Sequence, residues 1–295
     1  MSIQKKKFHK TVEYFLHKIY NVCHAKHKEE TDMAEKKQHN IVSADDGSQM
    51  TAAQQEAKKK KIKEAAPVGN AKTKRLLAVI LWVVAIAFEV LALMVALGKI
   101  NISFMSSMTQ LIVFIVLDLA CVIIGSQFWK QANHIDPASE ANKVKFWLWN
   151  NMGVIACLVA FVPLIILLLT RKDLDKKTKA VATVVAVIAL LIGGVASYDF
   201  NPVSAEQKQD AMAALNGETV YWAPFGKVYH THEDCHTLNQ SDTLTMGSVE
   251  QAIAAGRTRL CSYCAKNDNI NGVATDDKAA DAVEDAAEEV LEEVA

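Results

Sequence analysis

The chain has 295 residues, of which 51% are hydrophobic and 22% charged, and its 32 basic and 33 acidic side chains give a formal net charge of −1. These averages hide a partition: 17 of the basic residues precede Leu76, nine acids fall in the last 20 residues, and four long apolar runs lie between. The runs exclude a soluble globular enzyme. The six cysteines are too sparse for a disulfide-rich secreted protein, and two of them lie inside apolar runs.

The N-terminal third is polar and basic. Residues 1–28 are predicted to contain a basic amphipathic helix, because the apolar side chains between Phe8 and Cys23 share one face and lysines surround it. Such a helix would lie on an anionic membrane surface or pack on another protein. The stretch lacks the apolar core and cleavage site of a signal peptide, so we expect no cleavage before the first span. Residues 29–75 are predicted to be a polar, Lys-rich linker, flexible or partly helical.

Four apolar segments are each long enough to cross a bilayer, which takes about 20 helical residues. Basic residues bracket them, and tryptophans lie near their ends, where amphipathic rings favour the headgroup level. The fold class predicted is a mainly α membrane protein with a four-helix transmembrane bundle over 76–198. Its spans are expected at 76–98, 108–129, 146–170 and 180–197.

The distribution of Lys and Arg near the span ends favours an orientation. The side that holds the N-terminus has 12 basic residues near the spans, and the opposite side has six, five of which lie in the loop 171–179. The basic loop 171–179 favours the opposite orientation. The side with more Lys and Arg is nevertheless expected to be cytoplasmic, which places both termini in the cytoplasm. We therefore expect a multi-pass protein of a bacterial inner membrane, with the N- and C-termini cytoplasmic.

Two acids interrupt the apolar runs. Glu89 lies near the middle of the first span and Asp118 near the middle of the second, so a helical hairpin would hold them at similar depth. A carboxylate there should face the bundle interior, become protonated, or bind a cation. The pair could serve a small cation or proton transporter or channel. The simpler interpretation is a pair of protonated acids bonded to Asn150, Asn151 or the backbone.

Small residues recur on one face of the fourth span. They are spaced by three or four positions: Ala182, Ala186, Ala189, Gly193 and Ser197. Such a face lets another helix approach closely. We expect it to pack inside the bundle, and a homo-oligomer through the fourth span is the alternative.

A linker over 199–217 is expected to lead into a small domain over 218–268. Residues 219–230 read as two short strands around Pro224 and Gly226, a β-hairpin. Ser248 and Gln251 form a capping box before a short helix that Gly256 ends. Beyond the domain, residues 269–295 are predicted to be an acidic tail, helical or disordered.

The small domain contains a potential metal site. Its ligands are predicted to be His230, Cys235, Cys261 and Cys264, a His-x4-Cys pair followed after 25 residues by Cys-x2-Cys. Four such ligands suit tetrahedral zinc in a closed, structural site. His232 and His236 are alternative nitrogen ligands. Because the stretch is too short for a large apolar core, zinc would supply folding energy, which predicts a small α+β zinc-binding domain.

The ligands belong to a longer pattern over residues 218–266: Tyr229, His230, Cys235 and Leu238, then Ala252 and Gly256, then Cys261 and Cys264. This pattern resembles the small zinc-binding module of Ada type, which is found in a DNA-repair protein and appended to many bacterial proteins. The resemblance implies a zinc-organised fold. His230 stands where the Ada module has a cysteine, so methyl transfer does not carry over. The acids Glu233 and Asp234 offset the nearby basic residues, and we expect no nucleic-acid partner.

The predicted function is interaction rather than catalysis. The chain contains no nucleophile elbow, phosphate-binding loop or HExxH motif. We expect a membrane protein whose cytoplasmic zinc domain docks a protein partner or regulates one. Two alternatives stay open: transport through Glu89 and Asp118, and a redox or metal sensor whose cysteines release zinc on oxidation.

Overall fold

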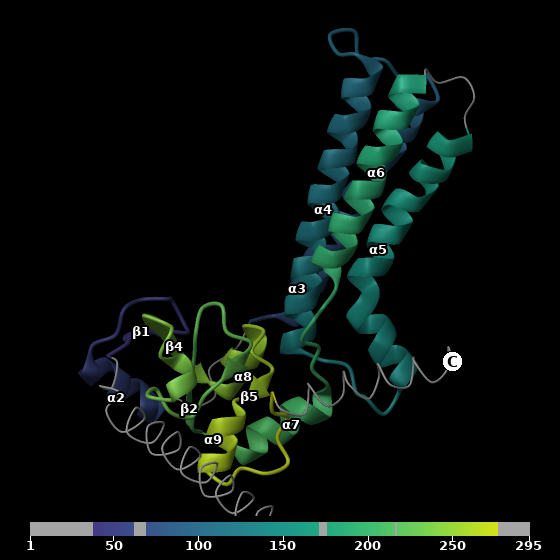
Figure 1. Cartoon of the computed structure of the whole chain (residues 1–295). Helices are drawn as coiled ribbons and strands as arrows, with labels where there is room; N and C mark the ends of the chain where they lie inside the picture. The colour runs from purple at the N-terminus through teal and green to yellow at the C-terminus, as the bar shows by residue number, and fades with distance from the viewer. Residues whose placement is uncertain (1–37, 62–68, 171–175, 216, 277–295) are drawn as a thin grey trace, which may run out of the picture.

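The computed structural model describes residues 38–61, 69–170, 176–215 and 217–276. The basic helix expected within 1–28 and the acidic tail beyond 276 lie outside these residues, as does part of the basic loop 171–179. The described chain forms a tall bundle of four helices with a smaller mixed α and β domain at one end (Figure 1).

The four predicted spans are confirmed as four helices, each long and apolar enough to cross a membrane. Short connections join antiparallel neighbours, so the bundle runs up and down (Figure 1). Large apolar side chains such as Val83, Leu169 and Leu191 are exposed on its outside, where lipid would cover them. The helices are α3 (Ala71–Ala96), α4 (Ser107–Ile135), α5 (Lys143–Thr170) and α6 (Lys176–Ser197).

The small-residue face of α6 is buried within the bundle at all five predicted positions, from Ala182 to Ser197. A Cβ atom placed on Gly193 would lie 2.7 Å from Sγ of Cys157 on α5 and 3.1 Å from Cδ1 of Leu119 on α4. The face is therefore used for packing inside the chain, as expected. A homo-oligomer through the fourth span would use another face of α6.

Two sheets and several short helices build the small domain. Strand β4 (Thr243–Ser248) is central in a three-stranded sheet, parallel to β1 (Asn40–Ser43) and antiparallel to β2 (Thr219–Trp222). Strands β3 (Val228–Tyr229) and β5 (Arg259–Leu260) form a parallel pair. The helical elements are α2 (Ala52–Lys61), α7 (Ala205–Ala214), the 3-10 turn η1 (His236–Leu238), α8 (Val249–Ala254) and α9 (Ser262–Asn267). The core between them includes Tyr229, Leu244, Met246, Ile253 and Leu260.

Residues 40–61 were expected to be part of a linker over 29–75. In the structure they belong to the small domain instead. Strand β1 adds to the edge of β4, and its Ile41 side chain is buried in the domain core. Asp45 accepts a hydrogen bond from Gln251 at 2.6 Å and pairs with Lys58 of α2 at 3.0 Å. Gly247 is needed here, because a Cβ atom on it would lie 2.7 Å from Cβ of Ala44.

Two further boundaries differ from expectation. Within the linker predicted over 199–217, helix α7 begins with a capping box between Ser204 and Gln207. At the other end the domain extends past residue 268, because Val273 is buried and the Leu260 amide donates to the Ala274 carbonyl at 2.9 Å. Asp276 then accepts from the Ser262 amide at 2.7 Å, at the start of α9.

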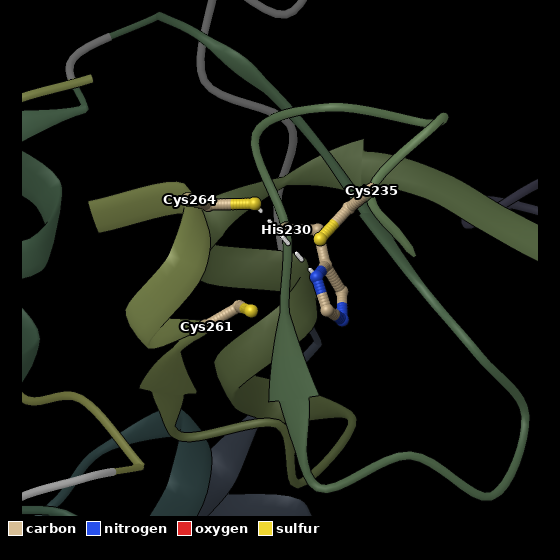
Figure 2. Close-up of side chains that lie close together, drawn as sticks. All are labelled: His230, Cys235, Cys261 and Cys264. Atoms are coloured by element: carbon tan, nitrogen blue, oxygen red, sulfur yellow. Dashed lines mark hydrogen bonds between the residues drawn. The ribbon is translucent and has the colours of Figure 1, made fainter. Parts of the chain in front are cut away.

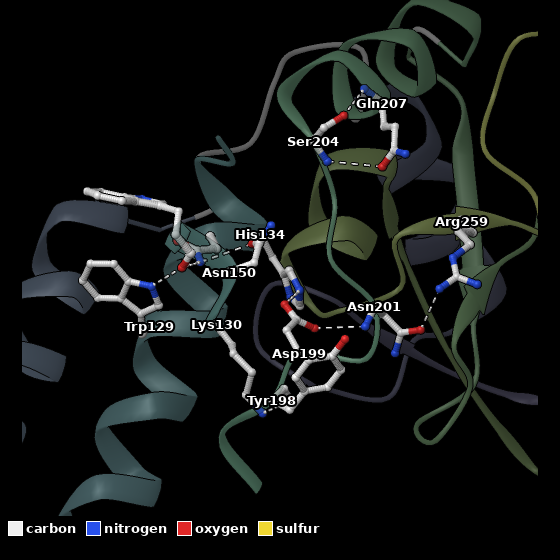
Figure 3. A network of polar contacts seen from close by, with 12 residues as sticks. Trp129, Lys130, His134, Asn150, Tyr198, Asp199, Asn201, Ser204, Gln207 and Arg259 are labelled. Atoms are coloured by element: carbon white, nitrogen blue, oxygen red, sulfur yellow. Dashed lines mark hydrogen bonds and ion pairs between the residues drawn. The ribbon is translucent and has the colours of Figure 1, made fainter. Parts of the chain in front are cut away.

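A polar network joins the domain to the end of the bundle (Figure 3). His134 near the end of α4 contacts Asp199 at 2.9 Å, and the other Asp199 oxygen accepts from the Asn201 amide at 3.0 Å. Arg259 of β5 donates to Oδ1 of Asn201 at 3.1 Å. Lys208 of α7 donates to the Ile135 carbonyl at 2.6 Å. The domain is therefore fixed to α4 by directional contacts as well as by the chain itself.

Candidate metal centre

His230 is positioned by the predicted β-hairpin, which the structure confirms. The amides and carbonyls of Tyr221 and His230 exchange two hydrogen bonds of 2.8 Å, and the Gly226 amide closes the turn on the Ala223 carbonyl at 3.1 Å. Arg257 donates to the carbonyls of Ala223 and Pro224 and braces the turn from outside. The hairpin buries the His230 ring, which is 3% exposed.

The three cysteines lie at the starts of two short helices. Cys235 precedes η1, and the Leu238 amide donates to its carbonyl at 2.8 Å. Cys261 precedes α9, and its own amide donates to the Tyr229 carbonyl at 2.9 Å, which ties it to the histidine hairpin. Cys264 lies one turn later in α9, so the Cys-x2-Cys spacing aims both sulfurs at one point.

These four side chains converge on a common centre (Figure 2). One ligand atom from each of His230, Cys235, Cys261 and Cys264 lies within 4.8 Å of all the others. The histidine presents Nδ1, which is 3.8 Å from Sγ of Cys264. One nitrogen and three sulfurs at such separations can hold a metal ion.

The hydroxyl of Thr237 supports the sulfur ligands from outside. Its Oγ1 lies 3.2 Å from Sγ of Cys235 and 3.7 Å from Sγ of Cys261. A hydroxyl in this place can donate to thiolates and steady them when they bind a cation. The sequence analysis did not identify Thr237. Its position two residues after Cys235, a predicted ligand, could have indicated a supporting hydroxyl.

The thiols affect one another's ionisation. Hydrogen bonds with Cys261 and Cys264 lower the pKa of Cys235, and Thr237 adds to that effect. The same contacts raise the pKa of Cys264, with the Cys235 interaction as the largest cause. The pKa of Cys261 is also lowered, so the protein groups by themselves disfavour ionisation of Cys264 relative to the other two thiols. A bound divalent cation would favour deprotonation of all three.

The two alternative histidines lie outside the cluster. His232 contacts Oδ1 of Asp268 at 2.7 Å, and this hydrogen bond raises the pKa of His232. The His236 ring packs edge-on against Tyr263, with 4.1 Å between ring centroids. Of the three histidines, the structure brings only His230 together with the cysteines.

The intramembrane acids lie elsewhere, in the bundle interior. Glu89 is 5% exposed and Asp118 is 1% exposed. The asparagines expected to partner them are occupied otherwise: Asn151 donates to the Trp147 carbonyl at 2.9 Å, and Oδ1 of Asn150 faces Asn133 at 3.5 Å. The expected bonding of the acids to Asn150 or Asn151 is therefore wrong, whereas the expected contact with the backbone holds for Glu89, at Leu164.

Comparisons with known proteins add no assignment. The chain matches no protein-family model, no curated protein and no solved structure. The Ada-type resemblance therefore stays a prediction from the pattern of residues.

Proposed function

We propose that the chain is an integral membrane protein whose small domain is organised by structural zinc and acts in docking or regulation. The observation that carries this proposal is the buried convergence of His230, Cys235, Cys261 and Cys264. Nitrogen and thiolate donors in a set of four favour tetrahedral zinc over Mg²⁺ or Ca²⁺, which prefer oxygen. The resemblance to the Ada-type module supports the same metal.

The proposed role of the zinc is structural. Four protein ligands complete a tetrahedral shell and leave no position for a catalytic water. Each ligand is also held by neighbouring backbone bonds, such as that between Cys261 and Tyr229. The metal would add cohesion to a small apolar core, and no substrate chemistry is assigned to it.

The docking role rests on what the domain displays. Phe225 at the tip of the hairpin is 99% exposed, while Arg257 fixes the turn that carries it. A rigid turn with a projecting aromatic ring is a suitable anchor for a protein partner, because little conformational entropy is lost on binding. We place the domain in the cytoplasm of a bacterial cell, where reducing conditions keep thiols available for zinc.

Elemental analysis of the purified full-length protein tests the proposal. We expect one zinc ion per chain, and its loss in Cys261→Ser and Cys264→Ser. His232→Ala and His236→Ala are matched controls that should retain the ion. A metal-free wild-type protein, or zinc loss in the His232→Ala variant with retention in His230→Ala, would contradict the assignment.

The sensor alternative predicts a different response from the same protein. If the domain senses oxidants, mild peroxide should release zinc, and a thiol reductant with added zinc should restore it. If the zinc is purely structural, the same mild peroxide treatment should not release it.

A further inference from the structure

Glu89 and Asp118 are brought together by the pairing of α3 and α4. The rings of Phe88 and Phe114 stack with 6.4 Å between centroids. A Cβ atom on Gly125 would lie 2.8 Å from the indole nitrogen of Trp82. These two contacts fix the antiparallel register, which places the two acids within about one helical turn of each other along the bundle.

The surroundings of the acids are apolar. The core of the bundle includes Ile115, Val122, Phe161 and Leu164, drawn from α4 and α5. The side chain of Asp118 forms no hydrogen bond through either oxygen, and Oε1 of Glu89 forms none, within the described chain. Such unpartnered oxygens point to a ligand that the protein groups themselves do not provide.

The apolar runs that hold the pair provide no cationic side chain to compensate it. The four apolar runs between Leu76 and Ser197 contain no Lys, Arg or His apart from those at their ends. Besides Glu89, the titratable side chains that interact with Asp118 are thiols: Cys121 on α4 itself and Cys157 on α5. The fully buried residues of α6 are small and carry no titratable group, as with Ala186 and Ala189. Two ionised carboxylates would be costly in this environment.

The ligand class follows from the donors available. Ca²⁺ takes about six to eight oxygen ligands and Mg²⁺ requires a near-octahedral set. Here the two carboxyl groups provide four oxygens among aliphatic, aromatic and thiol side chains. A proton needs one oxygen and neutralises the group that it binds, so it suits the pair better than a metal cation does.

Polar side chains reappear about two helical turns from Asp118 toward the small domain, beyond the buried Val122. Ser126 and the Ser197 carbonyl meet beside Gly153, where a Cβ atom would lie 2.7 Å from the serine Oγ and 3.2 Å from the carbonyl. Asn133 and Asn150 follow nearer the domain. Within the described chain three atoms of these residues also lack hydrogen-bond partners: Oγ of Ser197, Oδ1 of Asn133 and Nδ2 of Asn150.

Beyond these residues lies the junction with the domain. There, beside the His134–Asp199 pair (Figure 3), a cavity of about 540 Å³ is lined by both of these residues, Lys130, Tyr198 and Gly256. The opposite end differs, because Gln110 is buried with its amide bonded to Asn101 at 2.9 Å, Ile102 at 3.0 Å and Met105 at 2.7 Å. Within the described residues, the loop between α3 and α4 closes its part of that end with satisfied contacts, which favours access from the domain side.

We propose that Glu89 and Asp118 form a proton-binding site inside the membrane, which exchanges protons with water at the domain end of the bundle. In this step a proton passes from water to a carboxylate oxygen and returns by the same route, and no other reactant is consumed. The site is independent of the metal centre.

Carbodiimide labelling of the full-length protein in lipid vesicles tests the binding site. Dicyclohexylcarbodiimide reacts with protonated carboxyl groups in apolar surroundings, so we expect an adduct on Asp118 or Glu89 by peptide mass analysis. Labelling should slow as the pH rises. It should disappear in the double variant Glu89→Gln with Asp118→Asn, whose amides keep the size of the side chains. Exposed acids such as Glu206 are internal controls.

Three outcomes would overturn the site: absence of the adduct in the wild-type protein, labelling that does not depend on pH, or protection by Na⁺, Mg²⁺ or Ca²⁺ at constant pH. The last would replace the proton with a metal cation. Each of these readouts is made on the wild-type chain, so the conclusion does not depend on how the variants fold.

The access route is tested by infrared spectroscopy of the carboxyl stretch after transfer to D₂O. We expect several-fold slower deuterium exchange in the double variant Ser126→Ala with Ser197→Ala. Thr183→Ala is the matched control, because its hydroxyl bonds to the Lys179 carbonyl at 2.8 Å, near the opposite end of α6. Equal exchange rates in the serine variant and the wild type would contradict access from the domain side.

Discussion

The bundle and the small domain bury polar groups in opposite ways. In the domain, four side chains that could bind a metal ion converge and are held by backbone bonds from neighbouring strands and helices. In the bundle, three carboxylate oxygens of Glu89 and Asp118 lie among apolar side chains and have no hydrogen-bond partner among the described residues. One region could hold a metal ion, and we propose that the other binds a proton. The comparison suggests that the two regions respond to different chemical conditions.

The largest effect is expected from loss of a metal ligand. Cys264→Ser should unfold the small domain and leave the bundle helical, because metal binding supplies folding free energy of about 10–16 kcal/mol in zinc-finger peptides. Amide hydrogen exchange by mass spectrometry separates the two regions. Cys121→Ser is the matched control, since Cys121 lies on α4 outside the cluster. Equal loss of protection in both variants would contradict the metal account.

Strand β1 should contribute the next largest effect. Ile41→Ala removes a buried side chain from the domain core and should cost about 2–5 kcal/mol. Denaturant titration followed by hydrogen exchange in β4 measures the change. Lys60→Ala, at an exposed position on α2, should change stability by less than about 0.5 kcal/mol. Wild-type stability in the Ile41→Ala variant would mean that β1 is dispensable.

The junction should weaken in acid. Burial alone would raise the pKa of Asp199, but the hydrogen bond and charge of His134 outweigh it, so this pKa lies below its ordinary value. The lowered pKa means that the contact is stable above the ordinary aspartate range, near 4, and weakens as the pH falls through the lower folded-state value. Asp199→Asn should cost about 1.5–3 kcal/mol, as for a hydrogen bond to a charged group.

Hydrogen exchange of the amides in α8, which packs against α4, measures this effect. After correction for its intrinsic pH dependence, this exchange should become faster as the pH falls in the parent protein. The Asp199→Asn variant should lack this pH response. A response of the same size in both proteins would assign it to another group.

The smallest effect on stability is expected at the hairpin tip. Phe225→Ala should leave the free energy of unfolding within about 0.5 kcal/mol of the wild type, because the ring is exposed. It should nevertheless reduce the binding of a partner identified by cross-linking in cells. Lys227→Ala, two residues away, controls for a general change in the loop. If the Phe225→Ala variant binds the partner as well as the wild type does, the docking surface is at another place on the domain.

Local patterns allowed much of the fold to be predicted. The spans follow from apolar length, the hairpin at Pro224 from turn chemistry, and α8 from the Ser248 capping box, which the structure confirms. Each of these features is encoded within a few neighbouring residues or one helix length. The burial of Glu89 and Asp118 follows in the same way from the cost of a charge in the bilayer.

Non-local features could not be predicted. Strand β1 has four residues in a polar stretch, and its pairing with β4 joins Asn40 to Thr243, two parts of the chain that no local pattern relates. The spacing of residues also did not decide which of His230, His232 and His236 joins the cysteines. The hairpin decides it, because the bridge between Tyr221 and His230 directs this ring inward while His232 reaches Asp268. The partners of the acids were misjudged because Asn150 lies near the domain end of α5.

The central claim, a metal-organised domain on a membrane bundle, is tested most directly by chelation of the full-length protein followed by hydrogen exchange. Removal of the metal should abolish amide protection in β3, η1 and α9, leave α3 to α6 unchanged, and be reversed by one equivalent of zinc. Unchanged protection of the domain after complete metal removal would contradict the claim.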